Sequence, residues 1–126
     1  MILNKKLIDL AIDTAKKSTH HYRVGCVIFD KKRIISTGYN SSLKSAKKLH
    51  PKFQKWEFSV HAEAAAILNA RTDLSKCSML VIRINNDNQF RLAKPCRWCE
   101  AYIRYVDIKK VFYSIPEYPY LEEIKF

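Results

Sequence analysis

Residues 61–99 read HAEAAAILNARTDLSKCSMLVIRINNDNQFRLAKPCRWC and contain a helix, strand, helix pattern. The segment 61–70 consists of strong helix formers with apolar residues on one face, which predicts a buried helix. Residues 79–84 are mostly apolar and predict a strand, and the polar cluster that follows them predicts a turn. Pro95 suits the first turn of a second helix, because that turn leaves its N–H groups unpaired and proline has none. We expect this helix to end near Tyr105.

The flanking sequence predicts further helices and strands. Residues 1–18 carry apolar side chains at helical spacing, interrupted by aspartates, which indicates an amphipathic helix of the folded protein rather than a signal segment. Branched and aromatic residues at 22–29 and 34–39 predict a β-hairpin, and 110–115 predicts a last strand followed by a short tail. The order helix, hairpin, helix, strand, helix, strand predicts one α/β domain over residues 1–126, whose later strands run parallel because helices join them.

The chain is strongly basic. Its 126 residues include 23 Lys and Arg against 12 Asp and Glu, a formal charge of +11. Such a charge favours an anionic partner such as a nucleotide, RNA or DNA. A lysine-rich composition throughout the proteome would give the same charge without any role in binding such a partner. The most basic segment spans residues 41–56 and includes Lys44, Lys47 and Lys48. A solvated face is the alternative interpretation of that segment.

Cysteine content and hydropathy indicate the expected location. No apolar run approaches the roughly 20 residues that cross a bilayer, so we expect no membrane contact. The chain has 4 cysteines but no apparent signal peptide. We therefore expect reduced thiols and a soluble cytoplasmic protein.

Three side chains in the quoted stretch have the chemistry of zinc ligands. Cys96 and Cys99 are three residues apart, so both sulfurs lie on one face of a helical turn and can hold one ion. His61, at the start of the other predicted helix, can supply a third ligand and leave the fourth tetrahedral position to water, as in catalytic zinc sites. Glu63 lies in the same turn as His61 and can carry protons between that water and a substrate.

A C-x-x-C pair on its own is also typical of redox sites and of structural zinc sites. A structural zinc needs a fourth ligand, and the remaining candidates lie in no matching paired motif: His20, His21, His50, Cys26 and Cys77. We expect Cys26 to be a core residue, because it lies in an apolar segment. His20 and His21 are expected in a surface turn, with a place in the pocket as the alternative. The added His-Ala-Glu segment favours a catalytic zinc.

The His-Ala-Glu and Pro-Cys-x-x-Cys segments together match the signature of zinc-dependent nucleobase deaminases. The chain resembles the cytidine/deoxycytidylate deaminase superfamily, in the branch with histidine as first ligand, from Val24-Gly25 through Gly38-Tyr39-Asn40 to KVFYS at 110–114. The resemblance implies a cytidine deaminase-like three-layer α/β/α sandwich with a mixed sheet of four to five strands, a bound Zn²⁺, and association into a homo-oligomer. It also implies that Asn40, Val24 and the backbone at Ala62 contact the substrate.

Two features depart from the pattern of that superfamily. Residues 84–94 form an added polar loop before Pro95, and we expect this loop to reshape one wall of the pocket. The sequence also ends soon after residue 115, so we expect little room for the further helix and strand that many relatives have.

Three functions fit these residues. The first is a hydrolase that uses zinc to convert cytosine to uracil in a pyrimidine nucleoside or nucleotide, by breaking a C–N bond of a cyclic amidine. The second is a base deaminase that acts on single-stranded DNA or RNA, including tRNA adenosine, with Lys44, Lys47 and Lys48 contacting the strand. The third is a non-catalytic, zinc-stabilised module that binds nucleic acid. We favour the first function.

Overall fold

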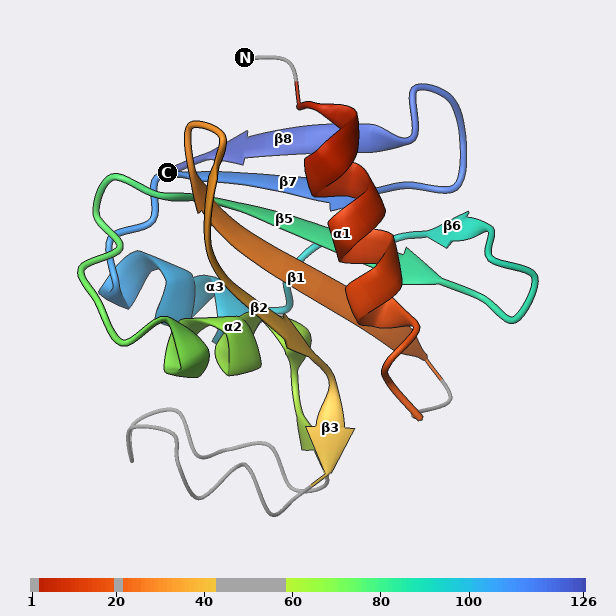
Figure 1. Ribbon diagram of the computed structural model, residues 1–126, viewed down its shortest axis with the longest axis horizontal. Helices are drawn as coiled ribbons and strands as arrows, with labels where there is room; N and C mark the ends of the chain where they lie inside the picture. The colour runs from red at the N-terminus through yellow and green to blue at the C-terminus, as the bar shows by residue number, and fades with distance from the viewer. Residues whose placement is uncertain (1–2, 20–21, 43–58) are drawn as a thin grey trace.

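The computed structural model describes residues 3–19, 22–42 and 59–126. Its centre is a six-stranded sheet with the order β2-β1-β5-β7-β8, in which the short β6 pairs with β5 outside this path (Figure 1). The strands of this sheet are β1 (Arg23–Asp30), β2 (Arg33–Tyr39), β5 (Ser78–Ile84), β6 (Phe90–Arg91), β7 (Lys110–Ser114) and β8 (Leu121–Lys125). A separate pair joins β3 (Ser41–Ser42) to β4 (Ser59–Val60).

Several residues singled out in the sequence lie outside the described residues. They are the lysines Lys44, Lys47 and Lys48 of the basic segment, and the histidines His20, His21 and His50.

The sheet is mixed, and the connections explain why. β1 and β2 form an antiparallel hairpin across the turn at 31–32, and β1 also pairs antiparallel with β5. β5 and β7 run parallel, with helix α3 (Arg97–Tyr105) in the connection between them. A parallel pair needs such a crossover, because a short turn only joins antiparallel strands. The parallel pairing that the sequence predicts for its later strands holds for β5 and β7.

Helix α1 (Lys5–Ala15) covers one face of the sheet (Figure 1). Asn4 caps it, because its side-chain Oδ1 accepts a hydrogen bond of 2.9 Å from the backbone N–H of Leu7. At Gly25 on β1 an added Cβ would lie 2.3 Å from the backbone oxygen of Ala11. Only glycine therefore allows α1 to pack this closely on the sheet.

Helices α2 (Ala62–Ala70) and α3 cover the opposite face. Alternate residues of β1 point to the two sides: Cys26 and Ile28 belong to the core under α2 and α3, and Val27 and Phe29 to the core under α1. Cys26 is fully buried, as expected from its apolar segment. The three layers confirm the predicted α/β/α sandwich.

Helix α2 packs closely against β2. A Cβ at Gly38 would lie 2.3 Å from the backbone nitrogen of Ala66. Beside it, the Ser36 hydroxyl donates to the carbonyl of Ala66 at 2.7 Å, and the Asn69 amide donates to the carbonyl of Thr37 at 2.8 Å. These contacts fix the height of α2 above the sheet.

The end of the chain differs from the prediction. The residues expected to form a short tail include β8, which pairs antiparallel with β7 and makes the sheet larger than four to five strands once β6 is included. The phenol of Tyr113 on β7 donates a hydrogen bond of 2.7 Å to the carboxylate of Glu122 on β8. The pairing places Leu121 and Ile124 against the core, so a five-residue segment is long enough to add a strand.

Among the described residues, the helices are all too short or too polar to cross a membrane.

Candidate metal centre and substrate cleft

His61 and Cys96 occupy equivalent positions at the starts of two helices. His61 precedes α2 with φ −70° and ψ 155°, and Cys96 precedes α3 with φ −70° and ψ 168°. Neither side chain caps its own helix by a hydrogen bond. Each turns instead toward the other, and the positive ends of both helix dipoles face the space between them. This arrangement favours anionic groups such as thiolates.

The side chains of His61, Cys96 and Cys99 come together in the geometry of a metal site. Their ligand atoms all lie within 4.8 Å of one another. The Nδ1 of His61 is 3.3 Å from the Sγ of Cys99 and 3.6 Å from the Sγ of Cys96. Tetrahedral zinc with ordinary bonds of about 2.1 Å to nitrogen and about 2.3 Å to sulfur separates such atoms by about 3.6 Å. The group can therefore hold zinc with little rearrangement.

The two sulfurs differ in their proton affinity. A hydrogen bond from Cys99, assisted by one from His61, lowers the pKa of the Cys96 thiol to about 3. The same hydrogen bond, together with burial, raises the pKa of Cys99 well above its ordinary value. The pair thus shares a thiolate at Cys96 and a proton at Cys99. Burial acts to lower the pKa of His61, but the hydrogen bond with Cys96 and the charge of Glu63 outweigh it and raise this pKa.

Glu63 lies in the first turn of α2 and is only 6% exposed. Burial raises the pKa of its carboxyl group, against the opposing effects of hydrogen bonds to its own backbone and to Cys99 and of the nearby His61. A raised pKa makes the carboxyl group easier to protonate, which suits a group that accepts and then donates a proton. Glu63 therefore has the properties of a general acid–base beside the metal-binding group.

These residues line a cleft of about 240 Å³. Its lining includes all the sequence-predicted site residues except Cys99, which is buried beneath: Val24, Asn40, His61, Ala62, Glu63 and Cys96. Its other wall comes from the predicted polar loop, through Leu92, Ala93 and Lys94. The loop thus contributes to the pocket, as the sequence suggests.

Asn40 is buried at the edge of the cleft and holds the start of β1. Its Oδ1 accepts a hydrogen bond of 3.0 Å from the backbone N–H of Val24, and its Nδ2 donates to the carbonyl of Tyr22. The hydroxyl of Ser18 donates to the Asn40 carbonyl at 3.0 Å. An amide side chain can make about four hydrogen bonds, so Asn40 fixes the cleft wall and keeps capacity for a ligand.

Sequence reasoning did not single out Arg83 as a residue of the cleft. The guanidinium carbon of Arg83 lies 4.2 Å from the centre of the Tyr22 ring, and both side chains line the cleft. The sequence did contain evidence for Arg83, because a cation is unusual inside an otherwise apolar strand. The position of Arg83 could not be interpreted without knowing which face of β5 carries the cleft.

Most of the chain matches a known protein family. The model of the cytidine and deoxycytidylate deaminase zinc-binding region matches residues 1–115. Among curated proteins, none matches the chain significantly.

Several solved structures share the fold. The apo dCMP deaminase from the cyanophage S-TIM5 is 17% identical, with a TM-score of 0.59 over 90% of this chain and 86% of that one. A structure from work on A-to-I editing by transfer-RNA deaminases at the wobble position is 19% identical, with a TM-score of 0.58 over 91% of this chain and 78% of that one.

A third structure is a larger protein. The diaminohydroxyphosphoribosylaminopyrimidine deaminase and 5-amino-6-(5-phosphoribosylamino)uracil reductase of Thermotoga maritima is 24% identical, with a TM-score of 0.56 over 86% of this chain and 28% of that one. These likenesses support the three-layer fold. The match over residues 1–115, together with a histidine and two cysteines gathered around space for one zinc ion, shows that the chain belongs to the cytidine and deoxycytidylate deaminase family of zinc-binding hydrolases.

Proposed function

We propose that the protein is a zinc-dependent hydrolase that removes the exocyclic amino group of cytosine in a nucleoside or nucleotide. One observation carries the proposal. The Nδ1 of His61 lies at zinc-like distances from the sulfurs of Cys96 and Cys99, and the buried carboxyl group of Glu63 lines the same cleft. A further solved structure with this fold is a cyanophage dCMP deaminase in complex with dCMP and dUMP, and it supports this substrate class.

The proposed ligands of the zinc are His61, Cys96 and Cys99. Zinc in such a site lowers the pKa of a water molecule to about 7, so that hydroxide becomes available at neutral pH. The ligand set needs both sulfurs as thiolates, which favours the reducing environment of the cytoplasm as the protein's location.

Glu63 is the proposed proton carrier. Deamination adds water to the carbon that bears the amino group and releases ammonia, so one proton must reach the ring nitrogen and another the departing amine. The carboxylate of Glu63 accepts a proton from water and passes it first to the ring nitrogen. It then takes up the remaining proton of the added water and delivers it to the leaving amine, which returns Glu63 to its starting state.

The proposed substrate contacts come from three segments of the cleft. Ala62 begins α2, where backbone N–H groups have no partner within the helix and can donate to a base oxygen. Val24 supplies an apolar wall at the start of β1. Asn40 presents its amide beside them, held by its bond to the Val24 backbone.

Ammonia release tests the proposal. The zinc-loaded protein is incubated with cytidine, deoxycytidine and their 5′-phosphates, and zinc is counted by elemental analysis. Glu63→Gln keeps the side-chain volume but loses the titratable proton, so it should retain about one zinc per chain and lose about 10²-fold or more in kcat.

Glu100→Gln is the matched control, because Glu100 lies in the first turn of α3 but pairs with Arg104 at the surface. It should leave kcat unchanged. Full activity of Glu63→Gln with zinc bound would contradict the assigned role, and release of no ammonia from any of these substrates would contradict the proposed reaction.

A base within a single strand is the second candidate substrate. The net charge of +11 and the cations Arg83 and Lys94 on the cleft favour it. Lys44, Lys47 and Lys48 are the residues proposed to contact such a strand. Activity on single-stranded DNA or tRNA should fall steeply as salt increases, whereas activity on one nucleotide should depend on salt far less.

A further inference from the structure

Two arginines face each other across neighbouring strands beside the cleft. Arg83 on β5 pairs directly with Arg91 on β6, the short strand at the end of β5 (Figure 1). Directly opposed residues of an antiparallel pair point to the same face, with Cβ atoms about 5 Å apart, and like charges in such positions repel. The ion pairs found among the described residues involve neither arginine. Two cations are thus held together without a carboxylate from the described part of the chain.

The arginine pair borders the catalytic cleft. Arg83 lines the 240 Å³ cleft together with Glu63, and it also lines an adjoining hollow of about 180 Å³ with Arg91 and Tyr22. Lys94 adds a third cation on the cleft wall. A base bound next to Glu63 would therefore extend its attached groups toward a positively charged rim.

A buried serine fixes the spacing of the two arginines. Ser114 on β7 is fully buried, and its Oγ accepts a hydrogen bond of 3.0 Å from the backbone N–H of Arg83. The same hydroxyl donates a hydrogen bond of 2.6 Å to the backbone carbonyl of Arg91. The Ser114 side chain thus joins the backbones of both arginines. The two arginines therefore lie on paired strands of the sheet and not on a loop.

The Arg83 side chain and the loop before Arg91 are also restrained. Arg83 stacks on Tyr22 at 4.2 Å from the ring centre. The loop between β5 and β6 is closed by hydrogen bonds of 2.9 Å from Asn85 to the Gln89 side chain and from the Gln89 backbone to Asn85. Arg83, held in this way, loses less conformational freedom when an anion binds.

We propose that Arg83 and Arg91 form a phosphate subsite, so that the substrate is an anionic nucleotide rather than a free nucleoside. Guanidinium groups bind phosphate oxygens through paired, charge-assisted hydrogen bonds, and a phosphate between the two arginines removes their mutual repulsion. The inference rests on the proposed function for the position of the base. The phosphate has two possible sources with the same chemistry, the 5′-phosphate of one nucleotide and the internal phosphate of a strand.

Paired substrates test the subsite. For the wild type, Arg83→Gln and Arg91→Gln, kcat/KM is measured for cytidine and for its 5′-monophosphate, in ribose and deoxyribose forms. The ratio of monophosphate to nucleoside should fall about tenfold or more in each variant, since each loses a charge-assisted hydrogen bond. Lys32→Gln removes one positive charge in the turn at the far end of β1, and it should leave the ratio unchanged.

Binding separates failure of the subsite from failure of the reaction. Equilibrium dialysis measures the affinity of the zinc-loaded protein for cytidine, its monophosphate and inorganic phosphate, whether or not ammonia is released. Tighter binding of the monophosphate than of cytidine, lost in Arg83→Gln, supports the subsite even if the reaction is different. Equal binding of the two compounds by the wild type, or an equal loss for both in the variants, overturns it.

A third ligand identifies the source of the phosphate. A dinucleotide with an internal phosphate and no terminal phosphate is compared with the monophosphate in the same assay. Stronger dependence on Arg83 and Arg91 for the dinucleotide assigns the subsite to a strand, and stronger dependence for the monophosphate assigns it to a single nucleotide. Dependence of neither ligand on the arginines overturns the proposal.

Discussion

Asn40 is a buried side chain that supports the backbone of the cleft wall. It is 8% exposed and satisfies the backbone N–H of Val24 and the carbonyl of Tyr22. Removing it leaves two backbone groups of the cleft wall without their partner. The residue therefore links the stability of β1 to the shape of the substrate site.

The variant Asn40→Ala should lower the free energy of unfolding by about 1–3 kcal/mol, the usual cost of leaving buried polar groups unsatisfied. Urea unfolding measures the effect. Asn69→Ala is the matched control, because the Asn69 amide also binds a strand carbonyl, that of Thr37, but at an exposed position. An equal loss of unfolding free energy in the two variants would show that the burial of Asn40 does not cause the effect.

The sequence predicted which residues form the site better than it predicted the contacts that each of them makes. The pairing of His61 with Cys96 and Cys99 could be predicted because the ligand types and their spacing allow little else. The hydrogen bonds of Asn40 could not, because they join residues 22–24 to residue 40 through a strand register that local sequence does not determine. The facing of Arg83 and Arg91 depends on register in the same way.

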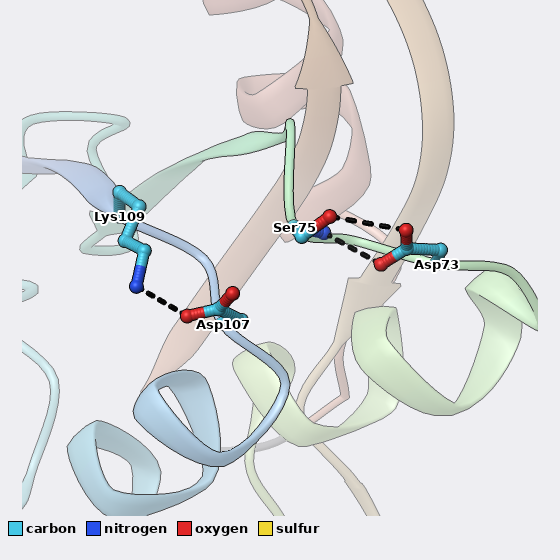
Figure 2. A network of polar contacts seen from close by, with 4 residues as sticks. All are labelled: Asp73, Ser75, Asp107 and Lys109. Atoms are coloured by element: carbon cyan, nitrogen blue, oxygen red, sulfur yellow. Dashed lines mark hydrogen bonds and ion pairs between the residues drawn. The ribbon is translucent and has the colours of Figure 1, made fainter.

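Charged side chains stabilise the turns that lead from the helices to the next strands. Figure 2 shows Asp73 and Ser75 after α2, and Asp107 and Lys109 after α3. The carboxylate of Asp73 accepts hydrogen bonds of 3.0 Å from both the backbone N–H and the hydroxyl of Ser75. These bonds lower the pKa of Asp73 below its ordinary value. The turn is thus stabilised by the ionised form of the aspartate.

The direction of the pKa shift gives a pH dependence. Because the folded pKa is lowered, the contribution of Asp73 is present above the pKa of the unfolded chain, about 4, and is lost as the pH falls through the folded pKa. Asp73→Asn should therefore be less stable than the wild type at pH 7, and the difference should disappear in strong acid. Thermal unfolding from pH 7 to pH 2 measures it.

Ser75→Ala keeps the backbone donor, which is the larger cause of the shift, and loses only the hydroxyl. It should show a smaller loss with the same pH dependence. A difference between Asp73→Asn and the wild type that stays constant across the pH range would exclude the hydrogen-bonded carboxylate as its origin.

Element types were predicted well where local signals were strong, and poorly where a strand depends on its neighbours. The apolar hairpin and the alanine-rich α2 have one reasonable interpretation each. By contrast, Leu121–Lys125 reads LEEIK, with three charged residues, and follows two prolines. Only pairing with β7 makes it a strand, and that pairing is tertiary.

At the scale of the whole molecule, a metal ion would join α2 and α3, which cover the same face of the sheet. His61 belongs to the start of α2, and Cys96 and Cys99 to the start of α3. A ligand that binds only the folded state stabilises it in proportion to the logarithm of its concentration over Kd, by about 2.7 kcal/mol at 100 times Kd. Metal loading should therefore stabilise the entire domain.

Removal of zinc by a chelator should lower the Tm, and added zinc should restore it. In His61→Ala the Tm should no longer respond to chelator. Cys77→Ala is the control for loss of a cysteine, since Cys77 lies before β5 and outside the metal-binding group. Its Tm should respond as the wild type does, and a lost response there would argue against the assigned ligands.

The absence of a side chain at Gly38 affects the geometry of the metal-binding group. The backbone of α2 rests on β2 where a single methyl group would not fit. Since the imidazole moves with α2 while both thiols move with α3, the thickness of that contact sets the separation between nitrogen and sulfur donors. A larger residue at position 38 should therefore displace the imidazole relative to the two thiols and weaken metal binding, even though β2 itself offers no ligand atom.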